Sequence, residues 1–206
     1  MFYRTMSTPE KPPRLILASA SPRRRELLAR LGLAFTVLPA DIEEHQLPGE
    51  EAHTYALRVA EAKARHVAQR LPDAFVLGAD TIVVLDRQIL GKPGKIEVAR
   101  HMLTRLSGRQ HTVLTALALL HDRRQFTRLD TVSTLVRFRY LSQAEIEQYL
   151  TTDEPLDKAG AYAIQGHAAA FIEAFEGCYT NVVGLPLQRT AALLQSAGLH
   201  VAPVRS

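Results

Sequence analysis

The sequence predicts an α/β domain in which helices flank a mixed β-sheet. Short apolar runs alternate with amphipathic segments in the first half of the chain, which is the order typical of strands joined by helices. Two longer apolar runs, residues 111–120 and 126–140, then flank a polar turn and indicate an antiparallel hairpin. Hydrophobic residues form 47% of the 206 residues, which suffices for one sizeable core. We expect two lobes around a cleft.

Capping residues mark where several elements begin. Ser21 and Pro22 are a preferred N-cap and first helical residue, so a helix directly follows the apolar run 14–19. Ser142 and Glu145 form a capping box that begins a helix after the hairpin. The other elements expected are a strand at 34–38, a helix at 51–71, a strand at 74–85 interrupted at 78–81, a helix at 96–106 and a last helix from 185 to about 198.

Charge and cysteine content narrow the class of protein. The net charge of +4 and the pI of about 9.4 suit an anionic ligand, of which nucleic acid is only one kind. A single cysteine excludes an intrachain disulfide framework and a cysteine-based zinc site. No run approaches the roughly 18–20 apolar residues of a membrane span. We expect a disordered extension over 1–13, one domain over 14–206, and a cytoplasmic location.

The clearest local signal is the arginine-loaded turn from Ser19 to Arg25. Arg23, Arg24 and Arg25 fall in the first turn of a helix, whose end already carries partial positive charge and free N–H groups. Each arginine there is unfavourable by a few tenths of a kcal/mol unless an anion docks beside it. The turn therefore indicates a phosphate site. The alternative is that the long side chains extend into solvent. The turn matches neither a Walker A loop nor a dinucleotide fingerprint.

Further polar groups interrupt apolar segments. Asp80 lies inside a strand, where a carboxylate is costly to bury unless it is hydrogen-bonded or binds a metal, so it is a candidate metal ligand or general base. The alternative for Asp80 is a turn or bulge. Lys92 follows Gly91 on a short connection, and residues 154–166 form a polar loop of the kind that carries function. Lys63 lies beside the apolar stripe of the helix at 51–71, and taken alone this position indicates a surface lysine whose stem lies along the helix.

Taken together, these segments resemble the Maf family of nucleotide pyrophosphatases over residues 14–199. The resemblance rests on the order and spacing of eight strings: LASASPRR (17–24), AEAKA (60–64), GADT (78–81), LGKP (90–93), LSGRQH (106–111), EPLDKAGAY (154–162), IQG (164–166) and YTNVVGLPL (179–187). It implies a two-lobed fold similar to that of inosine-triphosphate pyrophosphatases. It also implies hydrolysis of a nucleoside triphosphate to the monophosphate and pyrophosphate with Mg²⁺ or Mn²⁺.

The resemblance also implies roles for individual residues. Asp80 would be the proton acceptor and a metal ligand, with Glu43 or Glu44 as the second acidic residue. The positions that would bind the substrate or select it are Ser19, Arg23, Arg24, Lys63, Thr81, Lys92, Lys158 and Gln165. By analogy we expect a homodimer, no membrane association and no stable binding of nucleic acid.

The strings around Thr81, residues 159–162 and Gln165 resemble the branch that cleaves dTTP and UTP, and the resemblance extends the expected substrates to modified pyrimidine triphosphates. Two alternatives stay open: the branch acting on 7-methyl-GTP, and a nucleic-acid-binding or cell-division regulatory protein. Asp86-Arg87 departs from the family's usual Asp-Gly turn. A non-glycine residue at positive φ costs about 1 kcal/mol, so we expect another type of turn there.

Overall fold

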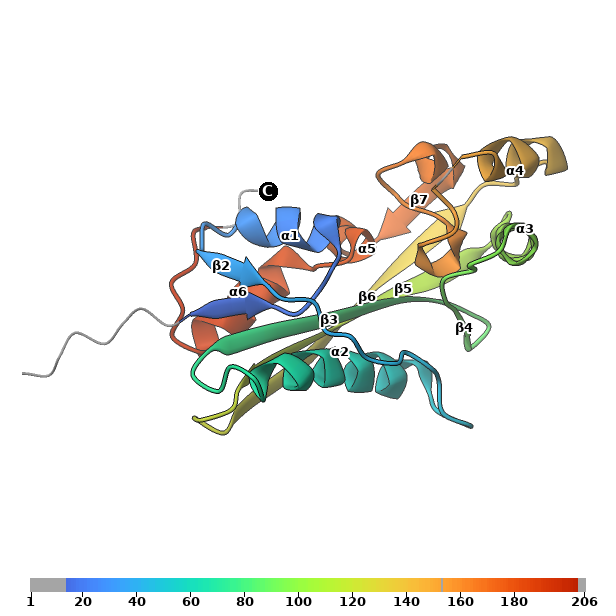
Figure 1. Ribbon diagram of the computed structural model, residues 1–206. Helices are drawn as coiled ribbons and strands as arrows, with labels where there is room; N and C mark the ends of the chain where they lie inside the picture. Colours follow the sequence, from blue (N-terminus) through green and yellow to red (C-terminus); the bar gives the residue numbers. More distant parts are fainter. Residues whose placement is uncertain (1–13, 153, 204–206) are drawn as a thin grey trace, which may run out of the picture.

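The computed structural model describes residues 14–152 and 154–203, and one mixed sheet runs through that part of the chain (Figure 1). Its strands are β1 (Leu15–Leu17), β2 (Phe35–Val37), β3 (Phe75–Leu85), β4 (Gln88–Leu90), β5 (Gln110–His121), β6 (Phe126–Phe138) and β7 (Ile172–Glu176). The helices are α1 (Pro22–Ala29), α2 (Ala52–Ala68), α3 (Ile96–Leu106), α4 (Gln143–Leu150), α5 (Tyr179–Val183) and α6 (Leu187–Ser196), with short 3-10 turns η1 (Ala159–Ala161) and η2 (His167–Phe171). The predicted fold class is confirmed. The predicted extension over 1–13 lies outside the described residues, and the domain boundaries stay a prediction.

The long strand β3 leaves part of one edge without a neighbour. The sheet order is β2-β1-β3-β5-β6-β7. On one edge of β3, β1 pairs in parallel with residues 75–77, and β4 pairs antiparallel with residues 83–85. On the other edge β5 pairs with residues 76–84. Among the described residues, 78–82 therefore have no strand partner on the first edge.

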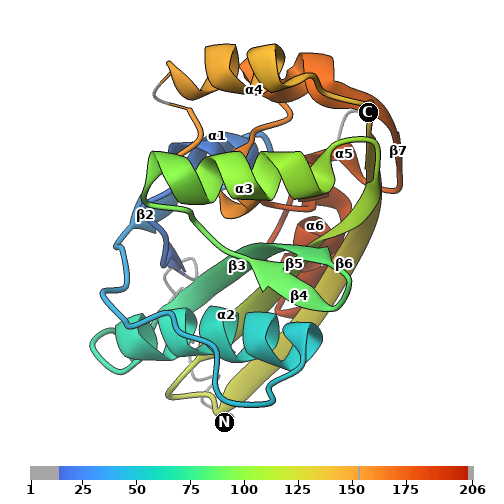
Figure 2. The same ribbon diagram turned by 90° about the vertical axis from the view of Figure 1, so that its right-hand side faces the viewer.

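Both faces of the sheet are covered, and one face carries two separate cores. Helix α2 packs on one face against alternate residues of β3 and β5. The opposite face carries one core under α1 and α6 and a second under α3 and α4. Figure 2 shows α2 on one side of the sheet and α3 on the other. These two cores are the predicted lobes. No described helix combines the length and apolar character that a membrane crossing demands.

Two local predictions about β3 and its turn were wrong. The strand continues through Gly78 and Asp80 without interruption, because Gly78 accommodates the backbone of α2 rather than breaking the pairing with β5. Asp86 and Arg87 both take positive φ, +52° and +65°, in the two-residue turn that joins β3 to β4. This geometry matches the twist of a hairpin, and Asp86 also accepts a 2.6 Å ion pair from Arg109.

Candidate active site

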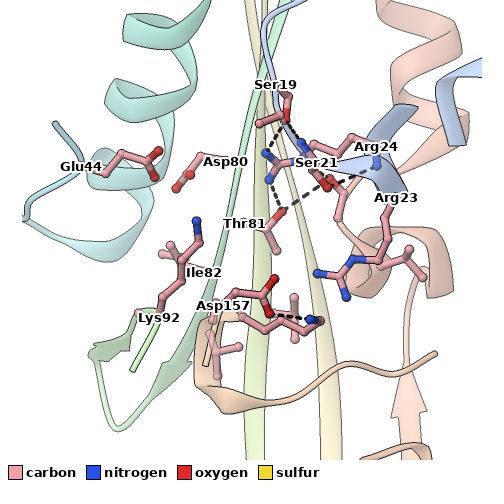
Figure 3. A pocket seen from close by; sticks show the side chains of 18 of the residues that line it. Ser19, Ser21, Arg23, Arg24, Glu44, Asp80, Thr81, Ile82, Lys92 and Asp157 are labelled. Atoms are coloured by element: carbon pink, nitrogen blue, oxygen red, sulfur yellow. Dashed lines mark hydrogen bonds and ion pairs between the residues drawn. The ribbon is translucent and has the colours of Figure 1, made fainter. Parts of the chain in front are cut away.

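A cavity of about 960 Å³ opens beside the unpaired edge of β3 (Figure 3). Most of the residues proposed from the sequence line it: Ser19, Arg23, Arg24, Glu44, Lys63, Asp80, Thr81, Lys92 and Lys158. They come from the β1–α1 turn, the 39–50 loop, α2, β3 and two later loops. The structure thus brings together motifs that lie up to 139 positions apart in the chain, from Ser19 to Lys158.

Strand alternation separates the two polar residues of β3. Successive side chains of a strand point to opposite faces, so Asp80 lies on the α2 face, and Thr81 faces the two-core side. Thr81 is also the point where the two cores part, because Ala79 belongs to the core under α1 and Val83 to the core under α3. The cavity therefore has a carboxylate wall and a guanidinium wall on either side of the unpaired edge of β3.

The carboxylate wall is built around Lys63. Its Nζ lies 2.8 Å from Asp80 Oδ1 and 3.0 Å from Glu44 Oε1. Lys63 and Asp80 are only 7% and 5% exposed, so each charge is stabilised by the other where water is largely excluded. The interpretation of Lys63 as a surface lysine is wrong. Helix α2 approaches β3 closely enough to place it, since a Cβ on Gly78 would lie 2.3 Å from the Ala60 carbonyl oxygen.

Arg24 forms the guanidinium wall. Its Nε donates to the Gly184 carbonyl at 2.9 Å, and its two terminal nitrogens donate to Ser19 Oγ at 3.3 Å and Thr81 Oγ1 at 2.9 Å. Burial lowers the pKa of Arg24, and the nearby charges of Asp80 and Glu44 oppose that change. Of the five N–H groups of a guanidinium, two remain for a ligand, one on each terminal nitrogen. As predicted, Ser21 caps α1, accepting from the Arg24 backbone N–H at 3.4 Å.

Three more cations surround the space between these walls. Figure 3 shows Arg23 and Lys92 pointing into the cavity from opposite sides. Within the described part of the chain, neither side chain has a hydrogen bond or an ion pair. Lys158 differs, because it donates to Asp157 Oδ1 at 2.5 Å and to the Glu154 carbonyl at 3.3 Å. Arg23 and Lys92 are therefore the cations most available to an incoming anion.

The structure distinguishes the two neighbouring glutamates. Glu44 faces Lys63 in the cavity, whereas the side chain of Glu43 is 91% exposed and lies 3.8 Å from His45. Gln165 is exposed and is absent from the described lining of the cavity. Its role in selecting the substrate stays a prediction.

Two lining residues, Tyr55 and Asp157, were missed by the sequence reasoning. Tyr55 is buried near Asp80 and Glu44, and burial, followed by those charges, raises its pKa to about 12. Tyr55 precedes Lys63 by eight positions and therefore lies on the same face of α2. This helical spacing was a signal that the sequence carried. Asp157 precedes Lys158 in the loop and contributes a carboxylate to the cavity wall opposite the strand.

The donor set suits a hard divalent cation held partly by substrate. Asp80 and Glu44 place two carboxylates in one cavity. No group of three or more histidine, cysteine or acidic side chains that could hold a metal occurs among the described residues. Mg²⁺ is commonly held by one or two carboxylates, with water and substrate phosphates as the remaining ligands. These residues therefore fit Mg²⁺ or Mn²⁺ bound together with a phosphate ester.

A family model described as Maf-like protein matches residues 14–197. The chain belongs to the Maf family. It is 55% identical over 188 residues to a dTTP/UTP pyrophosphatase of Anaeromyxobacter dehalogenans (strain 2CP-1), covering 90% of this chain and 95% of the relative. It is 52% identical over 199 residues to a dTTP/UTP pyrophosphatase of Bordetella parapertussis, covering 92% and 95%. A HAM1 protein structure from Coxiella burnetii shares its fold at 16% identity, with a TM-score of 0.53 over 89% of this chain and 99% of that one.

Proposed function

We propose that this Maf family member hydrolyses dTTP and UTP to the monophosphate and pyrophosphate. The observation that carries the proposal is the arrangement of one cavity, in which the Asp80–Lys63–Glu44 wall faces the cations of Arg23, Arg24 and Lys92 across the unpaired edge of β3. Relatives that are 55% identical over nine-tenths of the chain are named dTTP/UTP pyrophosphatase, which supports the choice of substrate.

The cations bind and polarise the triphosphate. Arg24 offers two remaining N–H groups, one on each terminal nitrogen of a guanidinium held by three hydrogen bonds, which suits binding of a phosphate. Arg23 and Lys92 reach the same space from opposite sides. Because charge accumulates on the leaving pyrophosphate as the bond breaks, positive groups fixed before the reaction lower the barrier.

Asp80 activates the water. Lys63 holds Asp80 Oδ1 and thereby fixes the carboxylate, which leaves Oδ2 to accept a proton from the attacking water. The water oxygen forms a bond to the α-phosphorus, the bond from that phosphorus to the bridging oxygen breaks, and the electron pair leaves with pyrophosphate. Mg²⁺ or Mn²⁺, held by Asp80 and Glu44 with phosphate oxygens, would supply Lewis-acid polarisation of the phosphate.

We assign selection of the base to the apolar part of the cavity next to Thr81. Apolar side chains of both lobes, among them Val83, Val113 and Val182, line that part of the cavity and suit the faces of a pyrimidine ring. Gln165 follows Ala163, which lines the cavity, by two positions, and its amide would contact the edge of the base. A cytoplasmic location and a homodimer belong to the same proposal and are supported by the family resemblance alone. Gel filtration with light scattering tests the dimer.

A substrate panel tests the proposal. The protein is incubated with dTTP, UTP, CTP and 7-methyl-GTP in Mg²⁺ or Mn²⁺, and the products are separated by ion exchange. We expect dTMP or UMP with pyrophosphate, and at least a 100-fold loss for Asp80→Asn. Preferential cleavage of 7-methyl-GTP would assign the chain to the other branch. Release of a diphosphate with orthophosphate, or full activity of Asp80→Asn, would refute the mechanism. Salt-sensitive binding to random DNA would instead favour a nucleic-acid partner.

A further inference from the structure

A chain of hydrogen bonds runs from Arg24 away from the cavity into the protein. The Arg24 guanidinium donates to Thr81 Oγ1 at 2.9 Å, and Thr81 Oγ1 lies 2.9 Å from Thr115 Oγ1 on the neighbouring strand β5. Thr115 Oγ1 in turn donates to the Asn181 carbonyl oxygen at 3.2 Å. Only the first two of these residues line the cavity together with the ligand-binding groups. Thr115 and Asn181 are buried behind it, both at 0% exposure.

We assign the direction of this chain of hydrogen bonds from its far end. A threonine hydroxyl has one proton, and that of Thr115 is given to the Asn181 carbonyl. With that proton so placed, Thr115 accepts from Thr81 at 2.9 Å. The other protein acceptor near the Thr81 hydroxyl is the Gly184 carbonyl oxygen at 3.5 Å, so its single proton goes to a protein partner in either case. Thr81 can still accept from Arg24, but it cannot donate to an oxygen of a substrate base. The hydroxyl of Thr81 is thus oriented by its protein partners.

Asn181 anchors the chain firmly. Its side-chain Nδ2 donates to the Val113 carbonyl at 3.0 Å and to Thr134 Oγ1 at 2.9 Å, which fixes the orientation of the amide and joins α5 to β5 and β6. These polar residues lie at the boundary of the two cores on the sheet face opposite α2. On β5, Leu117 belongs to one core and Val113 to the other, with Thr115 between them. Among the described residues the buried Asn181 Oδ1 has no hydrogen-bond partner, so the two bonds donated by Nδ2 hold the amide, and losing a bond in such a dry layer is costly.

We propose that Thr115 and Asn181 are positioning residues that, through Thr81, orient the Arg24 guanidinium toward the phosphates of the substrate. On this account Thr81 affects catalysis through Arg24 and does not donate to the base. The inference rests on the proposed function for its substrate, because it assumes that Arg24 binds the triphosphate.

Thr115→Val tests the inference, since valine matches the shape of threonine and removes both hydrogen bonds. Thr112→Val is the matched control, because Thr112 lies on the same strand, faces α2 and has no side-chain hydrogen bond within the described chain. We expect Thr115→Val to lower kcat/KM for UTP about ten-fold and to weaken binding of inorganic tripolyphosphate by a similar factor in calorimetry. Thr112→Val should change neither, and Thr115→Ser should restore both.

Variants of Thr81 distinguish its role in orienting Arg24 from direct recognition of the substrate base. Thr81→Val should lower kcat/KM for UTP and CTP by the same factor, and should have little further effect in an Arg24→Met background. A changed UTP-to-CTP ratio with normal tripolyphosphate binding would overturn the inference, as would equal tripolyphosphate affinities of Thr115→Val and Thr112→Val. Tripolyphosphate binding is measured without catalysis. A wild-type protein that fails to cleave UTP would therefore refute the proposed function and still leave the positioning role open to this test.

Discussion

Replacing Gly78 with alanine should disturb both the stability of the fold and the carboxylate wall. The new Cβ would lie 2.3 Å from the Ala60 carbonyl oxygen and 2.9 Å from the Ala64 backbone nitrogen, against ordinary contacts that begin at 3.4 Å. Both atoms belong to the backbone of α2, so the helix itself must retreat by about 1 Å. Overpacking of this kind costs about 1–3 kcal/mol, and we expect the upper part of that range.

The same displacement reaches the site. Lys63 lies on α2 between Ala60 and Ala64, whose backbone atoms the new Cβ would meet, and Asp80 follows Gly78 by two positions. The 2.8 Å Lys63–Asp80 contact must therefore lengthen, or the lysine must change rotamer. Misplacing a catalytic group by 1 Å can cost about 100-fold. The flexible lysine recovers part of this, and we expect about a ten-fold loss of kcat/KM.

Urea denaturation and steady-state hydrolysis of UTP measure the two effects of Gly78→Ala. Gly91→Ala is the stability control, because Gly91 has no atom within 4 Å of an added Cβ and its φ is not positive. Its free energy of unfolding should stay within about 0.5 kcal/mol of wild type. A Gly78→Ala protein with wild-type stability and wild-type kcat/KM would refute the close packing of α2 on β3.

Three further predictions concern separate parts of the chain. Glu44→Gln should lower kcat and raise the metal concentration needed for half-maximal activity, whereas Glu43→Gln should leave both within two-fold; equal effects would contradict the placement of Glu44. Burial holds the pKa of His111 at about 4, below its ordinary 6.5, so the folded state loses up to about 3 kcal/mol as pH falls through that interval. Urea titrations should show this loss in wild type and not in His111→Gln, and identical pH profiles would count against it. Arg87→Gly should raise Tm by about 2–4 °C, because glycine relieves a positive φ, while Arg87→Ala should not.

Local signals in the sequence predicted the elements well. The N-cap at Ser21 and the capping box at Ser142 are both present, because each depends on residues at most three positions apart. Helix α5 was not predicted, since a five-residue helix shows little periodicity of its own. The positive φ values of Asp86 and Arg87 were also unexpected, and there the twist of the β3–β4 pair outweighs residue preference.

The site was predictable as a set of motifs but not as a geometry. Asp80 was singled out because a carboxylate among apolar residues needs a partner, yet that partner, Lys63, lies on another element. Glu43 and Glu44 could not be distinguished, because their directions depend on contacts that hold the loop to α2, such as the 2.9 Å bond from Arg58 to the His45 carbonyl. Thr115 gave no signal, since one threonine in a long strand is ordinary.

Hydrolysis of UTP in H₂¹⁸O tests the central claim most directly, because it reports which phosphorus the water attacks. Because Asp80 holds the attacking water and positive charge surrounds the leaving pyrophosphate, we expect mass spectrometry to find one ¹⁸O in UMP and none in pyrophosphate. Label in the pyrophosphate would mean attack at the β-phosphorus, and label in orthophosphate would mean cleavage at the γ-phosphorus. Either result would contradict the account.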